Sequence, residues 1–75
     1  MKIRMTETKA DNQIVVDYDY VIDGYATGRI RHVSDLNFKR IKTYILLEGD
    51  VVRYGCTSDR RAHNCMMRLL SKKTQ

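Results

Sequence analysis

The strongest constraint on this 75-residue chain is a segment of strict alternation that ends in a turn signal. Between residues 13 and 22, every second side chain is apolar or aromatic, a period of two that is typical of a β-strand with one buried face. Asp23-Gly24 follows at once, and this dipeptide readily adopts the positive φ angles of a type I′ hairpin turn. We therefore predict a β-hairpin whose second strand covers about residues 25–33. Its first strand places five side chains on one face, namely Ile14, Val16, Tyr18, Tyr20 and Ile22.

Similar patterns predict the remaining strands. Residues 2–8 alternate before the hairpin and indicate a short strand. Residues 39–47 and 51–56 flank a Gly-containing turn at 48–50 and predict a second hairpin. We expect four to five strands in all, arranged as one antiparallel sheet that contains two hairpins.

The period then changes and predicts a helix from about residue 58 to residue 71. Apolar side chains recur there at three- and four-residue steps, as on the buried side of an amphipathic helix. Thr57 or Ser58 can cap its N-terminus. The chain is thus α+β, with one C-terminal α-helix packed across one face of the sheet. The predicted apolar stripe of the helix consists of Ala62, Cys65, Met66, Leu69 and Leu70.

The chain has no proline, no low-complexity segment and no linker, so we expect residues 1–75 to form one small domain. A chain of this length buries only about 60% of its unfolded surface, which leaves little room for a buried catalytic cavity. It has neither an apolar run of about 20 residues nor a signal-peptide pattern, so we expect no membrane contact and no export. Two cysteines suit a reducing compartment, and we predict a cytoplasmic location.

Basic charge is concentrated in the second part of the chain. Residues 1–26 carry three basic and five acidic side chains, a net charge of −2, whereas residues 27–75 carry eleven and four, a net charge of +7. This asymmetry indicates a polyanion or an acidic protein as partner, although a charged surface also simply keeps a small protein soluble. We predict that nine basic residues contact nucleic acid, namely Arg29, Arg31, Lys39, Arg40, Lys42, Arg53, Arg61, Arg68 and Lys72.

Polar residues follow one side of the predicted helix. Arg61, Asn64, Arg68 and Lys72 recur at steps of three and four residues, so they share a stripe. Arginine and asparagine can read guanine and adenine edges in a major groove, but non-specific phosphate contact is easier to satisfy. The stripe therefore favours phosphate contact, unless it is only a solvated helix face.

Tyrosine side chains suggest a stacking surface on the first hairpin. Without a bulge, a two-residue turn sets Tyr20 opposite Thr27 and Tyr18 opposite Arg29. Aromatic rings beside guanidinium groups suit single-stranded nucleic acid, because rings stack on bases while cations follow the phosphates. The resulting platform combines the stacking candidates Tyr18, Tyr20 and Tyr25 with Arg29 and Arg31.

The same tyrosines also fit a structural role. Tyr18 and Tyr20 share their face with aliphatic residues, so this face can equally be the core of the domain. A bulge at Gly28 would also move the two arginines to the other side of the hairpin. We expect Tyr18 and Tyr20 to be mostly structural and Tyr25 to be partly exposed.

No arrangement of residues in the sequence predicts catalysis or a cofactor. Cys56, His63 and Cys65 are three potential ligands at offsets that do not suit tetrahedral zinc, so we expect no metal. Asp17 and Asp19 lie two residues apart on a strand but have no assignable base or nucleophile beside them. We predict that the protein is not an enzyme and needs no cofactor.

The segment from Tyr44 to Arg61 resembles the opening of the GIY-YIG endonucleases. The similar residues are Tyr44-Ile45-Leu46, Tyr54-Gly55-Cys56-Thr57 and Arg60-Arg61. The resemblance implies that two tyrosines and a helix arginine surround a scissile phosphate, with a metal-binding glutamate later in the chain. No acidic residue follows Asp59 in this sequence, so that metal ligand has no counterpart and we exclude phosphodiester cleavage.

Together these observations predict a small non-catalytic cytosolic binding protein whose basic second half contacts nucleic acid. The alternative is a protein-binding regulator or inhibitor, of the kind found in phages and mobile elements, that docks its basic face on an acidic partner surface. This alternative rests on size and composition alone. Two copies of a domain this small bury additional apolar surface when they associate. We therefore also expect that the sheet edge can support a homodimer.

Overall fold

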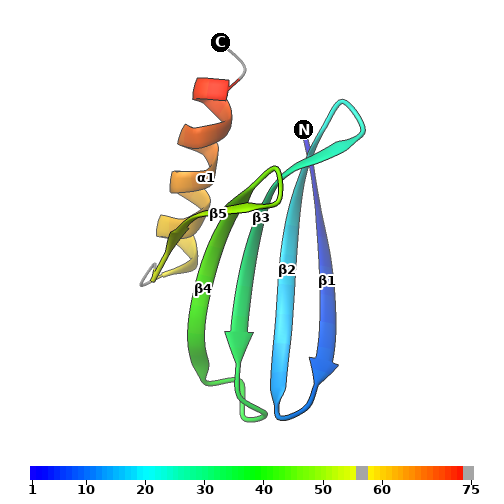
Figure 1. The fold of residues 1–75 in the computed structure, drawn as a ribbon, viewed down its shortest axis with the longest axis vertical. Coiled ribbons are helices and arrows are strands. Elements are labelled where there is room, and N and C mark those ends of the chain that lie inside the picture. Colours follow the sequence, from blue (N-terminus) through cyan, green and yellow to red (C-terminus); the bar gives the residue numbers. More distant parts are fainter. Residues whose placement is uncertain (56–57, 74–75) are drawn as a thin grey trace.

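The computed structural model describes residues 1–55 and 58–73, which form a five-stranded antiparallel sheet and one helix (Figure 1). The strands neighbour one another in the order of the sequence, and the predicted α+β class is confirmed. The second hairpin strand ends earlier than predicted, and Cys56 and Thr57 lie outside the described residues. The elements are β1 (Lys2–Ala10), β2 (Gln13–Ile22), β3 (Tyr25–Ser34), β4 (Arg40–Leu47), β5 (Asp50–Tyr54) and α1 (Asp59–Lys73).

The two predicted hairpin turns are present. Asp23 and Gly24 have φ angles of 52° and 83°, as a type I′ turn requires at both central positions. The β4–β5 turn repeats the arrangement, with φ angles of 52° at Glu48 and 87° at Gly49. The helix begins after Ser58, whose Oγ accepts a hydrogen bond of 3.2 Å from the backbone N–H of Arg61.

A bulge in the first hairpin changes the predicted register. Close to the turn the pairing is as predicted, but Tyr20 lies opposite Gly28 rather than Thr27, because β3 carries one extra residue there. From this point the two strands are shifted by one residue relative to the prediction, and Tyr18 lies opposite Ile30 instead of Arg29. The predicted tyrosine–arginine platform is therefore wrong, and the alternative of a bulge beside Gly28 is confirmed. The arginines of β3 point to the opposite side of the sheet from Tyr18 and Tyr20.

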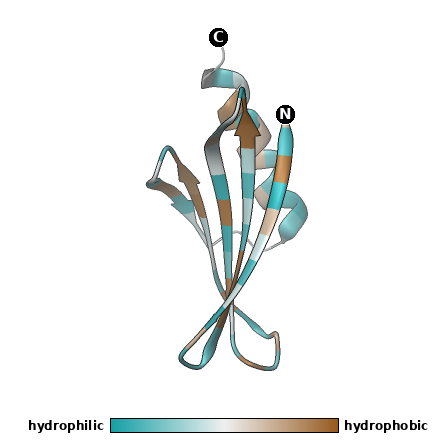
Figure 2. Cartoon of the chain, turned by 90° about the vertical axis from the view of Figure 1, so that its right-hand side faces the viewer, coloured by the Kyte–Doolittle hydropathy of each residue, from teal (hydrophilic) through white to brown (hydrophobic). Residues whose placement is uncertain are grey.

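Helix α1 packs on one face of the sheet (Figures 1 and 2). Figure 2 shows hydrophobic and hydrophilic bands alternating along the strands, as expected where one face is buried. Within the described chain no element covers the other face, which we call the uncovered face. Of the predicted helix stripe, Cys65 and Leu69 are only half-buried. The buried core consists of Tyr20, Ile30 and Ile45 from the sheet and Ala62, Met66 and Leu70 from the helix.

Gly28 permits the close approach of the helix to β3. A Cβ atom built on Gly28 would lie 2.4 Å from Sδ and 3.0 Å from Cε of Met66, distances that van der Waals packing does not allow. Met66 is fully buried, so its side chain has little room to move aside. The glycine is needed here for space and not for an unusual backbone angle.

Substituting Gly28→Ala should therefore destabilise the domain by about 1–3 kcal/mol, the usual cost of an extra methyl group in a packed core. Urea unfolding followed by circular dichroism measures this cost. In a Met66→Val background, which removes the atoms that the new methyl group meets, the cost of Gly28→Ala should largely disappear. A Gly28→Ala protein as stable as the parent would show that helix and strand do not meet at this residue.

Candidate nucleic-acid interface

A hollow of about 390 Å³ lies between β5 and α1. It is open at the surface, and most of the side chains that line it are polar or positively charged. We call it the arginine groove, because it joins one arginine of β5 to two of the helix. Its described lining residues are Arg53, Tyr54, Gly55, Arg61, Asn64, Cys65 and Arg68.

Strand register and helix spacing bring the three arginines together. Arg53 lies opposite the buried Ile45 of β4, so its side chain points to the helix side of the sheet. Its Nη1 donates a hydrogen bond of 3.6 Å to Sγ of Cys65 on the helix. Arg61 and Arg68 are seven residues apart, two helical turns, and therefore lie on the same side of α1 with Asn64 between them.

The arginine groove has no internal counter-charge among its described lining residues. These include no carboxylate, and the ion pairs found among the described residues join aspartates to Arg29, Arg31, Arg40 and His32. Three guanidinium groups around one hollow repel each other, and an anion placed between them relieves this repulsion. Planar guanidinium groups bind phosphate oxygens through two parallel N–H donors, so phosphate is an anion that suits the site.

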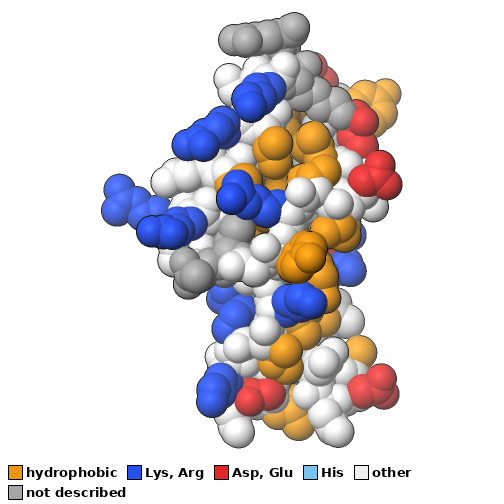
Figure 3. Space-filling model, turned by 60° about the vertical axis from the view of Figure 1, so that its left-hand side comes forward, with side chains coloured by type: hydrophobic (Ala, Val, Ile, Leu, Met, Phe, Trp, Pro, Cys, Tyr) orange, Lys and Arg blue, Asp and Glu red, His pale blue; other side chains and the backbone are white. Residues whose placement is uncertain are grey.

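Basic side chains are also visible around the groove on the surface of the molecule. Figure 3 shows them gathered over the helix side, with hydrophobic side chains between them. Lys72 lies one turn beyond Arg68 on the helix and is exposed. Of the nine predicted nucleic-acid contacts, the structure thus places Arg53, Arg61 and Arg68 in one groove and Lys72 along the same helix side.

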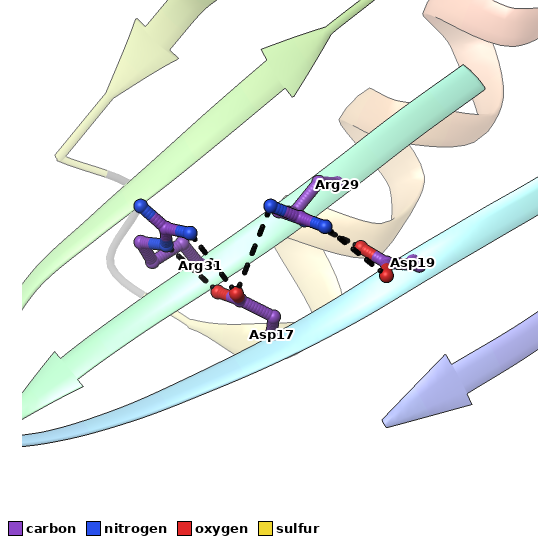
Figure 4. Close-up of polar contacts among 4 residues, drawn as sticks. All are labelled: Asp17, Asp19, Arg29 and Arg31. Atoms are coloured by element: carbon purple, nitrogen blue, oxygen red, sulfur yellow. Dashed lines mark hydrogen bonds and ion pairs between the residues drawn. The ribbon is translucent and has the colours of Figure 1, made fainter. Parts of the chain in front are cut away.

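Other predicted contacts are held in ion pairs. Arg31 binds Asp17 with Nε–Oδ1 and Nη2–Oδ2 distances of 2.8 Å and 3.0 Å, and Arg29 binds Asp19 with 2.5 Å and 3.3 Å (Figure 4). These hydrogen bonds, together with the carboxylate charges, raise the pKa of both guanidinium groups. The two arginines lie on the uncovered face, half-exposed, and their charges are balanced by the aspartates.

The three predicted stacking tyrosines are not among the described residues that line the arginine groove. Tyr20 is only 2% exposed, its hydroxyl is hydrogen-bonded to Nδ1 of His63, and burial raises the pKa of its phenol. Tyr18 is half-buried, and its ring makes an edge-to-face contact with the imidazole ring of His32. The expectation that these two are structural is confirmed, and Tyr25 at the hairpin turn is 76% exposed.

Two tyrosines that the sequence indicates only through the endonuclease-like segment lie side by side at this edge of the sheet, and one of them, Tyr54, lines the arginine groove. Tyr44 and Tyr54 are cross-strand partners on β4 and β5, and Lys42 lies over both rings. The signal was present in the sequence, because β4 alternates and its Ile45 and Leu47 point inward. Residues 44 and 46 must then point to the uncovered face.

A polar network fixes the start of the helix on the sheet. His32 is buried on β3, where Nδ1 lies 3.0 Å from Oγ1 of Thr43 and Nε2 lies 3.6 Å from Oδ1 of Asp59. Arg40 Nη1 donates to the same Asp59 oxygen at 2.9 Å, and this bond lowers the pKa of the carboxyl. Arg40, a predicted nucleic-acid contact, is thus engaged in anchoring the helix, whereas Lys39 is exposed in the preceding loop.

Stability should depend on pH through His32. Burial lowers the pKa of this imidazole below its ordinary 6.5, Arg40 lowers it further and Asp59 raises it. Below pH 6.5 the unfolded chain therefore takes up a proton that the folded protein does not, and the free energy of unfolding falls. The slope from this one group is at most about 1.4 kcal/mol per pH unit.

Urea unfolding at several pH values between about 7.5 and 5 measures this loss. A His32→Asn variant lacks the titrating imidazole, so its stability should change less over the same range. A His63→Asn variant is the matched control and should keep the loss, because His32 is unchanged. Equal pH slopes in the parent and in His32→Asn would contradict this role of His32.

Other kinds of site find no support in the described part of the chain. Residues 1–55 and 58–73 contain no group of three His, Cys, Asp or Glu side chains placed to hold a metal ion. Among the same residues, α1 is too short and too polar to cross a membrane. Comparison of the chain with family models, curated proteins and solved structures gives no match. The function is therefore inferred from the geometry of the arginine groove.

Proposed function

We propose that this protein is a non-catalytic cytoplasmic nucleic-acid-binding protein that holds the phosphate backbone in the arginine groove. One observation carries the proposal: Arg53, Arg61 and Arg68 converge from two elements on one hollow whose described lining includes no carboxylate. Phosphate oxygens accept from guanidinium forks at short distance and neutralise their repulsion.

The extent of the basic surface favours a polymer over a single small anion. Arg61 and Lys72 are eleven residues apart on one helix side, which corresponds to about 16 Å at 1.5 Å per residue. A stacked nucleic-acid strand advances about 3.4 Å per nucleotide, so this row extends along about five phosphates. A lone phosphate would occupy only one part of it.

The lining of the groove favours binding without cleavage. General acid–base chemistry on a phosphodiester most often uses an imidazole or a carboxylate within hydrogen-bond reach. The described residues that line the arginine groove offer neither. We therefore propose a role in holding, covering or competing for nucleic acid.

An acidic protein surface is the second candidate partner. One feature favours it: β1 is exposed along its whole length, and Ile3 and Met5 are 45% and 64% exposed. Exposed apolar side chains on a sheet edge suit a protein partner better than a phosphate backbone. Such a partner would pair with the edge of β1 and place its acidic groups toward the basic helix side.

A charge-matched pair of variants tests the proposal. Binding of a fluorescein-labelled 20-nucleotide strand is measured by anisotropy across a salt series. Replacing Arg53, Arg61 and Arg68 together with Ala should weaken binding at least about tenfold and reduce the log–log salt slope by about 2, because three phosphate contacts are lost. The fold should persist, since Arg61 and Arg68 are exposed on the helix.

The control removes the same charge from the opposite edge of the sheet. The three basic residues of β1, Lys2, Arg4 and Lys9, are all exposed and are replaced with Ala in the same way. This variant should bind almost as well as the parent. If both triple variants lost affinity equally, binding would follow net charge alone, and the arginine groove would not be the site. Competition by polyglutamate as strong as that by the oligonucleotide would favour the acidic protein partner.

A further inference from the structure

A second surface adjoins the arginine groove on the uncovered face of the sheet. Tyr44 and Tyr54, which we call the tyrosine pair, are direct cross-strand partners on β4 and β5. Both rings face away from α1. Ile45, which follows Tyr44 on β4, is fully buried beneath the helix, and successive side chains of a strand point to opposite faces. The structure thus has an aromatic surface and a cationic groove on the two sides of the same edge strand.

The rings of the tyrosine pair are accessible. Tyr54 is 67% exposed, Tyr44 is partly exposed, and no element of the described chain packs over them. The ammonium group of Lys42 lies 5.5 Å and 5.3 Å from the two ring centroids. A cation over exposed rings contributes only about 0.5–1 kcal/mol, so a flexible lysine can leave the rings for a phosphate when a base arrives.

A fixed guanidinium group extends the aromatic surface across the sheet. Arg31 lies opposite Tyr44 on β3, and its two hydrogen bonds to Asp17 hold the guanidinium plane in place. Because Asp17 balances its charge, Arg31 adds little to the attraction of phosphates. Its plane can still stack on an unpaired base, as arginine does in single-strand recognition.

Tyr54 connects the two surfaces, because it belongs to the tyrosine pair and also borders the arginine groove. We propose, building on the proposed function, that the nucleic acid bound here is single-stranded. Its backbone lies in the arginine groove, and successive bases cross the edge of β5 to stack on Tyr54 and then on Tyr44.

The geometry distinguishes single strands from a duplex. Directly opposite side chains on neighbouring antiparallel strands have Cβ atoms about 5 Å apart. Bases in a stacked strand are about 3.4 Å apart, so two bases on the tyrosine pair must separate from each other. Unpaired bases can separate in this way, whereas the bases of a duplex are enclosed and leave only phosphates to bind.

Binding of three labelled probes tests this proposal: 12-nucleotide oligo(dT), 12-nucleotide oligo(U) and a 12-base-pair DNA duplex. The parent protein should bind the single strands more tightly, and the comparison of the first two probes shows whether DNA or RNA is preferred. Tyr54→Ala should weaken single-strand binding about 5- to 150-fold and weaken duplex binding much less, because the enclosed bases of a duplex cannot stack on this ring. Tyr54→Phe keeps the ring and should bind within about twofold of the parent.

Tyr25 provides a matched control, because it is 76% exposed but lies at the start of β3, beside the Asp23-Gly24 turn, so Tyr25→Ala should not change binding. Thermal melting by circular dichroism checks that each variant folds. Equal binding of duplex and single strands, or an equal loss on both with Tyr54→Ala, would overturn the single-strand proposal and leave the arginine groove intact. If replacing Arg53, Arg61 and Arg68 together with Ala left the affinity for nucleic acid unchanged, the proposed function would instead be overturned.

Discussion

The close approach of α1 to β3 over Gly28 is the contact on which the rest of the arrangement depends. Met66 fills the space that a side chain at position 28 would occupy, and this fixes the height of the helix above the sheet. Polar contacts then fix its orientation, because Asp59 is bonded to Arg40 and His63 to Tyr20. With one side of the helix held in this way, the side that carries Arg61 and Arg68 faces β5. The arginine groove is thus a consequence of core packing.

The bulge in the first hairpin determines how charge is distributed between the two faces of the sheet. With one extra residue in β3, Arg29 and Arg31 lie opposite Asp19 and Asp17 and form balanced pairs on the uncovered face. The arginines of β5 and α1 have no such partners in the described lining of their groove. Three arginines without a carboxylate in the described lining are therefore gathered on the helix side of β5, although basic residues occur throughout the second part of the chain.

Local patterns in the sequence were sufficient to predict most of the fold. Alternation, the Asp23-Gly24 turn and the change to helical spacing correctly indicate five strands followed by a helix. A bulge at Gly28 was one of two registers that the sequence allows, but the alternation on either side fits both equally well, so local patterns could not decide between them. The consequence for the candidate site was large, since the register decides whether tyrosines and arginines share a face.

The groove itself combines a predictable and an unpredictable part. Helical spacing alone places Arg61, Asn64 and Arg68 on one side of α1. The addition of Arg53 depends on how the second hairpin lies against the helix, a long-range relation that no local pattern contains. The alternation of β4 places Tyr44 on the uncovered face, but its pairing with Tyr54 depends on the register of the second hairpin.

Titration of ¹⁵N-labelled protein with unlabelled 12-nucleotide oligo(dT), followed by two-dimensional ¹H–¹⁵N NMR, locates the bound strand on the protein residue by residue. If nucleic acid lies in the arginine groove, the amide chemical shifts should change mainly in β4, β5 and the side of α1 that lines this groove. The amide chemical shifts of β1 and of the Asp23-Gly24 turn should not change. Shift changes centred on β1 and β2, or no changes at millimolar oligonucleotide in low salt, would contradict the assignment of this groove as a nucleic-acid site.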